Sequence, residues 1–296
     1  MAMQRREFLR LAGIGGVFLV TGLGRTALAG GDKATAEEFF FVQMSDSHWG
    51  FSGPAVNPEA AVTLKKAVVQ VNALPKRPDF IVFTGDLTHT TDDPQERRKR
   101  LGEFKEIISA LAVKDVKFIP GEHDASLDNG EAFKEFFGPT HYAFSHKGTH
   151  FIALDNVSDP AASLGEEQLN WMAAELAKLD RNAPLVVLAH RPLFDLYPQW
   201  DWATRDGAKA VALLEPFADV TALYGHIHQE NHHLTGAIPH HAAESLIFPL
   251  PAPGSVPKRV PIPWDPAEPF KGLGVRGIEA TPAKKNLELT EYPLRG

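Results

Sequence analysis

Short apolar runs alternate with amphipathic stretches along the chain from residue 39 onward. The runs have the length of buried strands, and several are rich in Phe, Val and Ile, which favour extended backbone. The stretches between them repeat their apolar residues every three or four positions, as one face of a helix requires. This pattern predicts strands over 39–42, 80–83, 116–119, 185–188 and 220–224, and helices over 58–74, 94–112, 164–179 and 207–217.

Two apolar runs are too close in sequence to enclose a helix. Residues 142–144 and 150–154 flank Lys147-Gly148, and a glycine in a short polar connection is typical of a hairpin turn. An antiparallel hairpin beside strand–helix–strand units implies a mixed sheet. A last strand is expected over 287–292. We therefore expect an α/β fold that forms one domain over residues 30–296.

A proline-rich segment, residues 247–270, interrupts this pattern and is called the proline-rich arm below. Eight prolines lie between Pro249 and Pro269, and proline is excluded from helix interiors and central strands because it lacks the backbone N–H. The arm is therefore expected to be extended, partly polyproline backbone. We interpret it as a passive surface connection, and the alternative is an arm that gates access of a substrate.

The composition excludes several kinds of site. Of the 296 residues, 44% are hydrophobic and 23% are charged, which is typical of a globular chain with a sizeable core. The chain contains no cysteine, so disulfides, thiolate zinc sites, iron–sulfur clusters and cysteine nucleophiles are excluded. Metal ligands, if there are any, must be His, Asp, Glu or Asn side chains.

The first 29 residues have the features of an export signal. Arg5-Arg6 precede an apolar, glycine-rich run over 11–23, and small residues at 27 and 29 fit a signal-peptidase site. The paired arginines followed by Phe-Leu resemble a twin-arginine signal, which implies export of the folded protein by the twin-arginine machinery to the periplasm or the extracellular space. The run is shorter than the roughly 20 apolar residues of a spanning helix, so we expect no stable membrane anchor.

The exported part of the chain is acidic. Without residues 1–29, which hold four arginines and one glutamate, it has 26 basic and 36 acidic residues and a net charge of −10. The basic run over 97–100 lies in a predicted helix with Glu96 and Glu103 nearby, which is typical of a solvated helix face. Because nucleic acids bind to cationic surfaces, we expect no nucleic-acid patch.

Polar side chains that can bind metal follow five of the predicted strands. Residues two apart at a strand end point to the same side, and open α/β sheets place their sites at the carboxyl ends of strands. Each cluster alone is typical of a turn or helix cap, but five in succession favour a metal site. The clusters are Asp46-Ser47-His48, Gly85-Asp86, Gly121-Glu122-His123-Asp124, His190 and Gly225-His226-Ile227-His228.

This ordered set resembles the calcineurin-like metallophosphoesterase family, whose pattern runs D-x-H, G-D, G-N-H-D/E, H and G-H-x-H. The match extends over residues 46–228. The resemblance implies a four-layer sandwich, in which two mixed β-sheets are flanked by helices, and a site for two metal ions. By motif position, one ion would be held by Asp46, His48 and His228 and the other by Glu122, His190 and His226, with Asp86 bridging them.

The activity that the resemblance implies is hydrolysis of phosphate mono- or diesters by a hydroxide activated between two ions, which we expect to be Mn, Fe or Zn. His123 would donate a proton to the leaving group, and Asp124 would orient His123 unless it serves as a cap or turn residue. The motifs are most similar to those of the cyclic-nucleotide phosphodiesterase branch. The alternative function is that of a non-catalytic or single-metal relative that acts as a periplasmic binding protein.

Glu122 departs from the family pattern, which has Asn at this position. A carboxylate adds a negative charge to the ligand set. We predict that Glu122 either favours a trivalent ion beside a divalent one, or weakens attraction for dianionic monoesters relative to monoanionic diesters. The third possibility is that Glu122 turns away and leaves a weak second site.

Three further features are interpreted from their chemistry and position. Arg191 follows the fourth cluster and could pair with phosphate oxygens of a substrate. His89 lies either beside the metal ligands or in a surface turn. The histidine pairs at 232–233 and 240–241 are expected to be solvated.

Overall fold

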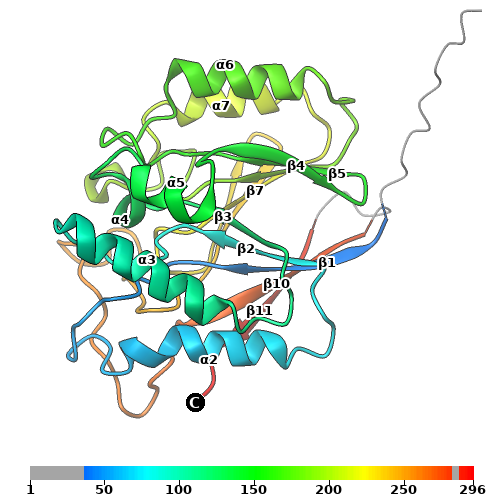
Figure 1. The fold of residues 1–296 in the computed structure, drawn as a ribbon. Helices are drawn as coiled ribbons and strands as arrows, with labels where there is room; N and C mark the ends of the chain where they lie inside the picture. The colour runs from blue at the N-terminus through cyan, green and yellow to red at the C-terminus, as the bar shows by residue number, and fades with distance from the viewer. Residues whose placement is uncertain (1–36, 282–286) are drawn as a thin grey trace, which may run out of the picture. The chain divides into compact units, whose positions relative to one another are not determined.

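The computed structural model describes residues 37–281 and 287–296, which form two mixed β-sheets (Figure 1). In the first sheet the strand order is β11-β10-β1-β2-β3. Strands β1, β2 and β3 run parallel, and β10 pairs antiparallel with both β1 and β11. The bounds are β1 Phe39–Met44, β2 Phe80–Thr84, β3 Val116–Ile119, β10 Gly274–Ala280 and β11 Glu288–Pro293.

The second sheet has the order β4-β5-β6-β7-β9-β8. Strands β5, β6, β7 and β9 run parallel, and an antiparallel hairpin closes each edge. The bounds are β4 Tyr142–His146, β5 Thr149–Ala153, β6 Leu185–Leu188, β7 Val220–Tyr224, β8 Asn231–Thr235 and β9 Ile238–Ala242.

Helices cover the outer face of each sheet and complete the four layers that the family resemblance implies. The helices α2 and α3 pack on the first sheet, and α6 and α7 pack on the second (Figure 1). Short helices α4 and α5 follow β3. The bounds are α2 Ala60–Asn72, α3 Pro94–Ile108, α4 Glu122–Ala125, α5 Glu131–Phe137, α6 Gly165–Leu176, η1 Pro198–Trp200 and α7 Gly207–Leu214.

Alternation along the strands explains this layering. In β1 the side chains of Phe39 and Phe41 enter the core between the two sheets, whereas Phe40 and Val42 enter the core beneath α2 and α3. Both faces are therefore apolar, which is why the strand appears in the sequence as an unbroken apolar run. The same alternation in β2 and β6 gives three stacked hydrophobic cores, as a four-layer sandwich requires.

The predicted strands and helices form, and the main differences are at helix ends. The first turn of α3 is capped by Asp93, whose carboxylate accepts hydrogen bonds from the backbone N–H groups of Gln95 and Glu96. This helix ends at Ile108 rather than at residue 112, because Leu111 N bonds to Ile108 O in a tighter turn. Leu111 is still buried, so apolar periodicity continued past the helix itself.

Three strands were not predicted. The hairpin of β8 and β9 contains four histidines and little apolar periodicity, and β10 contains two glycines and two charged residues. Their pairing depends on neighbouring strands rather than on their own pattern. His240 is fully buried in this hairpin, so the expectation that both histidine pairs are solvated is wrong for this residue.

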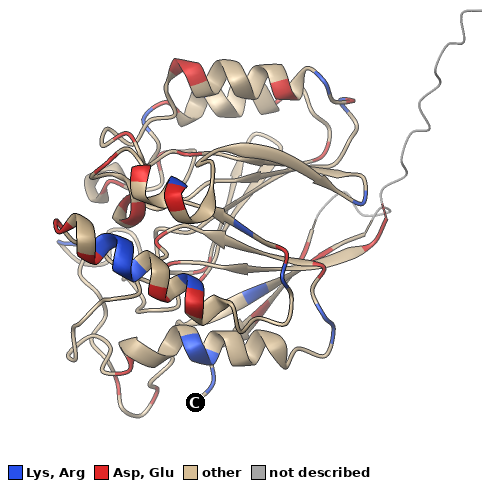
Figure 2. Ribbon diagram, viewed as in Figure 1, with Lys and Arg blue, Asp and Glu red and all other residues tan. Residues whose placement is uncertain are grey.

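The basic run in α3 is only partly solvated. Figure 2 shows both signs of charge on this helix. Arg98 is exposed and pairs with Glu135 at 2.6 Å, as a solvated face predicts. Arg97 is instead buried, and its guanidinium lies 2.7 Å from the carboxylate of Asp128.

The proline-rich arm forms turns and extended backbone, and between residues 249 and 270 it contains no helix or strand. Its backbone is joined to the domain where Ile262 N donates to Pro249 O at 3.0 Å and Trp264 N donates to Ala55 O at 3.1 Å. The predicted signal peptide, residues 1–29, lies outside the described residues. Within the described residues, none of the helices combines the length and apolarity needed to cross a membrane.

Candidate metal centre

The five predicted clusters meet at one place, where the carboxyl ends of β1, β2, β3, β6 and β7 lie next to one another. Four overlapping groups of potential ligand atoms form there, and the atoms of each group lie within 4.8 Å of one another. Two of these groups consist of buried side chains except for Glu122, which is partly exposed. The first group is Asp46, His48, Asp86 and His228, and the second is Glu122, His190 and His226.

The first group brings two imidazole Nε2 atoms and two carboxylates together. His48 Nε2 lies 3.1 Å from His228 Nε2 and 3.4 Å from Asp86 Oδ2, and His228 Nε2 lies 3.3 Å from Asp46 Oδ1. Two imidazole nitrogens on one tetrahedral zinc are about 3.4 Å apart, so this spacing fits shared coordination. His228 Nδ1 donates to Phe248 O at 2.8 Å, which leaves Nε2 without a proton and free to bind a cation.

The second group surrounds the carboxylate of Glu122. Its oxygens lie 2.9 Å from His190 Nε2 and 2.9 Å from His226 Nδ1, so the possibility that Glu122 turns away is wrong. His190 Nδ1 bonds to Thr84 O at 2.6 Å, which again directs an unprotonated Nε2 into the site. Asp86 Oδ2 lies 3.4 Å from His190 Nε2 as well as from His48 Nε2, and so it stands between the two groups.

The residues present fit a metal ion. His190 Nε2 is buried and makes no hydrogen bond within the described residues, although carboxylate oxygens of Asp86 and Glu122 lie close to it. A buried nitrogen without a hydrogen-bond partner, with carboxylate oxygens converging on it, matches a coordination shell. All seven side chains are oxygen or nitrogen donors, which suit Mn, Fe and Zn.

The electrostatics of the site agree with cation binding. Burial opposes ionisation of Glu122, but the charges of His226 and His190 outweigh it and hold the pKa of Glu122 well below its usual range. Burial lowers the pKa of His48 well below its usual range and also lowers that of His226. Burial disfavours the charged form of His190 too, yet Asp86 and Glu122 raise the pKa of His190. Without a cation, a proton on His190 would therefore compensate the carboxylates.

His123 lies at the edge of the second group with its ring held by Thr90. The backbone N–H of Thr90 donates to His123 Nδ1 at 3.2 Å, and the Thr90 hydroxyl lies 2.6 Å from the same atom. Because Nδ1 accepts, the proton of the neutral ring is on Nε2, which lies 4.0 Å from Asp86 Oδ2. Sequence reasoning missed Thr90, since a threonine among other polar residues carries no distinguishing signal.

Asp124 does not contact His123 through its carboxylate in the described hydrogen-bond network. Its oxygens accept from Leu87 N, Thr88 N and Gly121 N at 2.9 to 3.0 Å, and from the Thr88 hydroxyl at 3.0 Å. Burial and the nearby Asp86 raise the pKa of Asp124 to about 6. This geometry is that of the turn residue considered as the alternative, because Asp124 joins the loops after β2 and β3.

His89 lies beside the ligands rather than on an isolated surface turn. Its Nδ1 is 3.3 Å from His48 Nδ1, and its ring stacks on that of His123 with centroids 4.9 Å apart. His89 therefore contacts the side of His48 that faces away from the first ligand group.

Arg191 is engaged by protein groups. It is buried, its Nη2 donates to the backbone oxygen and the carboxylate of Asp201, and its Nε lies 3.4 Å from His226 Nε2. Arg191 does not line the pocket over the metal ligands, and the arginine that does is Arg259. The expectation that Arg191 meets substrate phosphate is thus not what the geometry favours.

A pocket of about 150 Å³ lies over the two ligand groups. Part of its wall comes from the proline-rich arm, so the arm lies beside the site, and its role as a passive connection or as a gate stays a prediction. The lining residues are His48, Asp86, Glu122, His123, His226, His228, Phe248, Leu250, Arg259 and Pro261.

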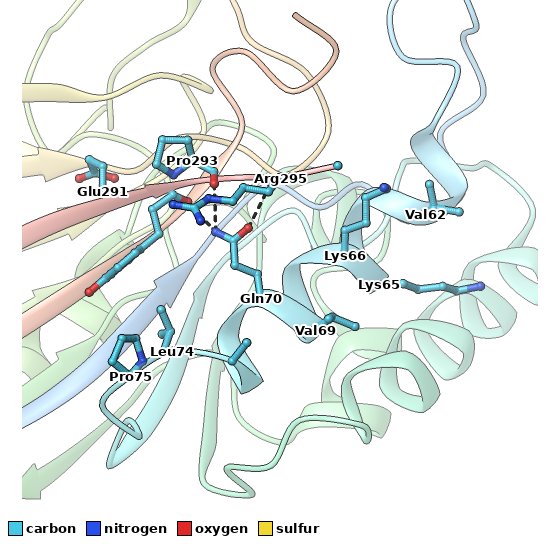
Figure 3. A pocket seen from close by; sticks show the side chains of 13 residues that line it. Val62, Lys65, Lys66, Val69, Gln70, Leu74, Pro75, Glu291, Pro293 and Arg295 are labelled. Carbon is cyan, nitrogen blue, oxygen red and sulfur yellow. Dashed lines mark hydrogen bonds between the residues drawn. The ribbon is translucent and has the colours of Figure 1, made fainter.

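A larger cavity of about 690 Å³ lies between α2 and the C-terminal residues and shares no lining residue with the metal pocket (Figure 3). Gln70 spans it, and its amide donates to the backbone oxygens of Tyr292 and Pro293 (Figure 3). None of the five metal-competent clusters contributes to this cavity.

Comparisons with known proteins agree with this geometry. A family model described as Calcineurin-like phosphoesterase matches residues 41–230. A probable cyclic nucleotide phosphodiesterase from Rhodococcus erythropolis is 29% identical over 226 residues, which cover 71% of this chain and 71% of the relative. A probable glycerophosphodiester phosphodiesterase, GpdQ, from Arcobacter nitrofigilis is 29% identical over 208 residues, 64% of this chain and 71% of the relative. The crystal structure of a dimetal phosphatase from Danio rerio has the same fold, with a TM-score of 0.61 at 14% identity over 87% of this chain and 96% of that one.

Proposed function

Because the chain belongs to the calcineurin-like phosphoesterase family, we propose that it is an exported, two-metal phosphoesterase that prefers phosphate diesters. The observation that carries the proposal is the position of Asp86, whose Oδ2 lies 3.4 Å from a histidine of each ligand group. One carboxylate between two groups is the arrangement that two adjacent ions require. The names of the two bacterial relatives, both phosphodiesterases, support the diester preference.

The chain's own residues divide into two ligand sets. In this proposal Asp46, His48 and His228 hold one ion, Glu122, His190 and His226 hold the other, and Asp86 touches both. Two such ions would neutralise the phosphoryl oxygens and lower the pKa of the attacking water. The protein holds the ligands in place through backbone carbonyls on the far side of His190 and His228.

His123 is the proton donor of the proposed reaction. The hydrogen bond from Thr90 N leaves the ring proton on Nε2, the nitrogen that faces Asp86. His123 lines the pocket and is partly exposed, so it can reach the leaving oxygen of a bound ester. The imidazolium form of His123, in which the Thr90 hydroxyl accepts from Nδ1, would donate its Nε2 proton to that oxygen as the bond to phosphorus breaks. The ring then becomes neutral and no free alkoxide is released.

Glu122 supports the diester preference through charge. With Asp46, Asp86 and Glu122 ionised, the site carries one more negative charge than a family member with Asn at this position. Repulsion disfavours a dianionic monoester more than a monoanionic diester. Glu122→Asn is therefore expected to raise monoester turnover relative to diester turnover. An unchanged ratio, together with unchanged bound metal, would overturn this role.

The proposed activity is tested by hydrolysis of 4-nitrophenyl phosphate and bis(4-nitrophenyl) phosphate with Mn²⁺, Fe²⁺, Zn²⁺ or Co²⁺. We expect faster diester hydrolysis and a loss of at least a hundredfold in Asp86→Asn. Asp92→Asn is the matched control, because Asp92 is exposed and contributes to neither ligand group. A folded, metal-loaded protein without activity on either ester would contradict the proposal and favour the binding-protein alternative.

Export is tested separately from activity. We propose that residues 1–29 direct the folded, metal-loaded chain through the twin-arginine pathway to the periplasm or the extracellular space. Replacing Arg5-Arg6 by Lys-Lys should keep the protein in the cytoplasm, as measured by fractionation of the producing cells. Unchanged export of that variant, or a purified chain that retains residues 1–29, would contradict the assignment.

A further inference from the structure

The proline-rich arm contributes four residues to the lining of the metal pocket. Arg259 and Pro261 line the same pocket as the ligands His226 and His228. Phe248 and Leu250, at the start of the arm, line it as well. One wall of the pocket is therefore built from a segment far from the five ligand clusters in sequence.

The arm is held at both sides of Arg259. Before it, the Gln229 amide donates to Pro251 O at 3.0 Å, and after it, Ile262 N donates to Pro249 O at 3.0 Å. Farther on, Trp264 N donates to Ala55 O at 3.1 Å. Prolines restrict the backbone between these points, so the backbone around Arg259 is restrained before any ligand binds.

Among the described residues, Arg259 is the only Lys or Arg that lines this pocket. No hydrogen bond or ion pair joins its guanidinium to another residue within 37–281 and 287–296. Arg191 contrasts with it, because that side chain is engaged by Asp201 and lies near His226. The pocket also presents the carboxylates of Asp86 and Glu122, so a cation in its wall reduces the repulsion that an anionic substrate meets.

We propose that Arg259 binds a non-bridging oxygen of the phosphoryl group of the substrate, so that the arm supplies the anion-binding residue of the active site. This inference rests on the proposed phosphoesterase function. The pocket lies over the two ligand groups, so a phosphoryl group bound there would lie beside the wall to which Arg259 belongs. A guanidinium can donate two parallel hydrogen bonds to such oxygens. The ligand class comprises phosphate esters and inorganic phosphate, the product that monoester hydrolysis would release.

The test compares Arg259→Gln with Lys258→Gln in the metal-loaded protein. Lys258 is also exposed on the arm, but it does not line the pocket, so it is a matched control for the loss of one positive charge. Affinity for inorganic phosphate is measured by calorimetry, and kcat and KM are measured with bis(4-nitrophenyl) phosphate. Bound metal is determined for each variant.

We expect Arg259→Gln to weaken phosphate binding and raise KM about tenfold, because a charge-assisted hydrogen bond at an exposed site is lost. Bound metal should not change, and Lys258→Gln should change both values by less than about twofold. Arg259→Lys should recover part of the affinity, because it restores the charge without the planar pair of donors.

Equal effects of Arg259→Gln and Lys258→Gln would overturn the inference, and so would a wild-type protein that does not bind phosphate at millimolar concentration. Failure of the inference about Arg259 is distinguishable from failure of the proposed phosphoesterase function. If the wild type hydrolyses esters but Arg259→Gln behaves like Lys258→Gln, only the role of Arg259 is wrong. If the wild type binds phosphate through Arg259 but hydrolyses no ester, the role of Arg259 stands and the catalytic proposal fails.

Discussion

At the scale of single residues, hydrogen bonds on the far side of each imidazole decide which nitrogen faces the site. Carbonyl oxygens of Thr84 and Phe248 accept from Nδ1 of His190 and His228, so the two Nε2 atoms can bind a cation. At His123 the backbone N–H of Thr90 instead donates to Nδ1, so in the neutral ring Nε2 carries the proton. In the proposed function, the same type of side chain would thus serve as a ligand or as a proton donor according to its partner.

We predict that Thr90→Val lowers kcat by about threefold to tenfold with little change in KM, because one hydrogen bond that holds His123 is lost. The loss should be larger for an ester with a poor alkyl leaving group than for a 4-nitrophenyl ester, since only the former needs a proton. Steady-state kinetics on the two esters measure this. Thr91→Val is the control, and equal losses for both leaving groups would contradict the role of His123 as proton donor.

His240 is predicted to make the protein acid-sensitive. Burial, with His233 and His241 nearby, lowers the pKa of His240 to about 4. The unfolded chain therefore takes up this proton first, and stability is lost as the pH falls from about 6.5 toward 4. Relative to His240→Leu, the wild type should lose up to about 1.4 kcal/mol of unfolding free energy per pH unit in this window. Urea denaturation at several pH values measures the difference, and parallel profiles would contradict it.

At the scale of elements, the turns after the strands hold their ligands in backbone conformations that are unusual for side-chain-bearing residues. Asp46, His48, Asp86, His226 and His228 all have positive φ, between 40° and 65°. Each such residue costs of the order of 1 kcal/mol, and strain of this kind concentrates at functional sites. The loops are therefore less stable locally than unstrained loops would be, but they hold the potential ligands in position.

We predict that Gly85→Ala abolishes metal retention. Gly85 has a φ of +95°, and a Cβ there would collide with the His190 ring. Gly138→Ala is the matched control, since Gly138 has a φ of +86° but open space around it. Metal analysis of the purified variants should show loss in the first and retention in the second. Full metal content in Gly85→Ala would show that the loop after β2 adapts without disturbing His190.

At the scale of the whole described domain, the candidate metal centre lies between the two sheets and takes its side chains from both. The loops after β1, β2 and β3 supply Asp46, His48, Asp86 and Glu122 from the first sheet, and those after β6 and β7 supply three histidines from the second. A cation bound here would compensate buried carboxylates and connect the two halves of the sandwich.

Metal removal is therefore expected to lower the melting temperature by about 10 °C, the shift that a ligand at about a thousand times its Kd produces in a protein of this size. Scanning calorimetry with and without chelator measures the shift, and added Mn²⁺ should reverse it. Asp86→Asn should show a much smaller response to chelator. A wild-type melting temperature that does not respond to chelator would contradict a structural contribution of the metal.

Much of the fold could be predicted because its strands carry their own signal. Strands such as β1 and β2 are apolar on both faces, since each separates two cores. The polar hairpin of β8 and β9 carries no such signal, because neighbouring β7 supplies its pairing. Helix ends were predicted too late where buried residues such as Leu111 continue the apolar pattern past the last helical turn.

The sequence by itself determined the strand ends and the metal-competent side chains placed on them. The spacing of apolar residues and the residue types are local properties of a chain, so both can be read without the fold. It also determined that these ligands are oxygen and nitrogen donors, since there is no cysteine. Only the tertiary structure decided that Thr90 holds His123, that Asp124 joins two loops, and that Arg259 rather than Arg191 lines the pocket. Contacts around the site join residues that are far apart in the sequence, and His48 and His228 are 180 positions apart. No local pattern in the sequence specifies which distant residues will meet.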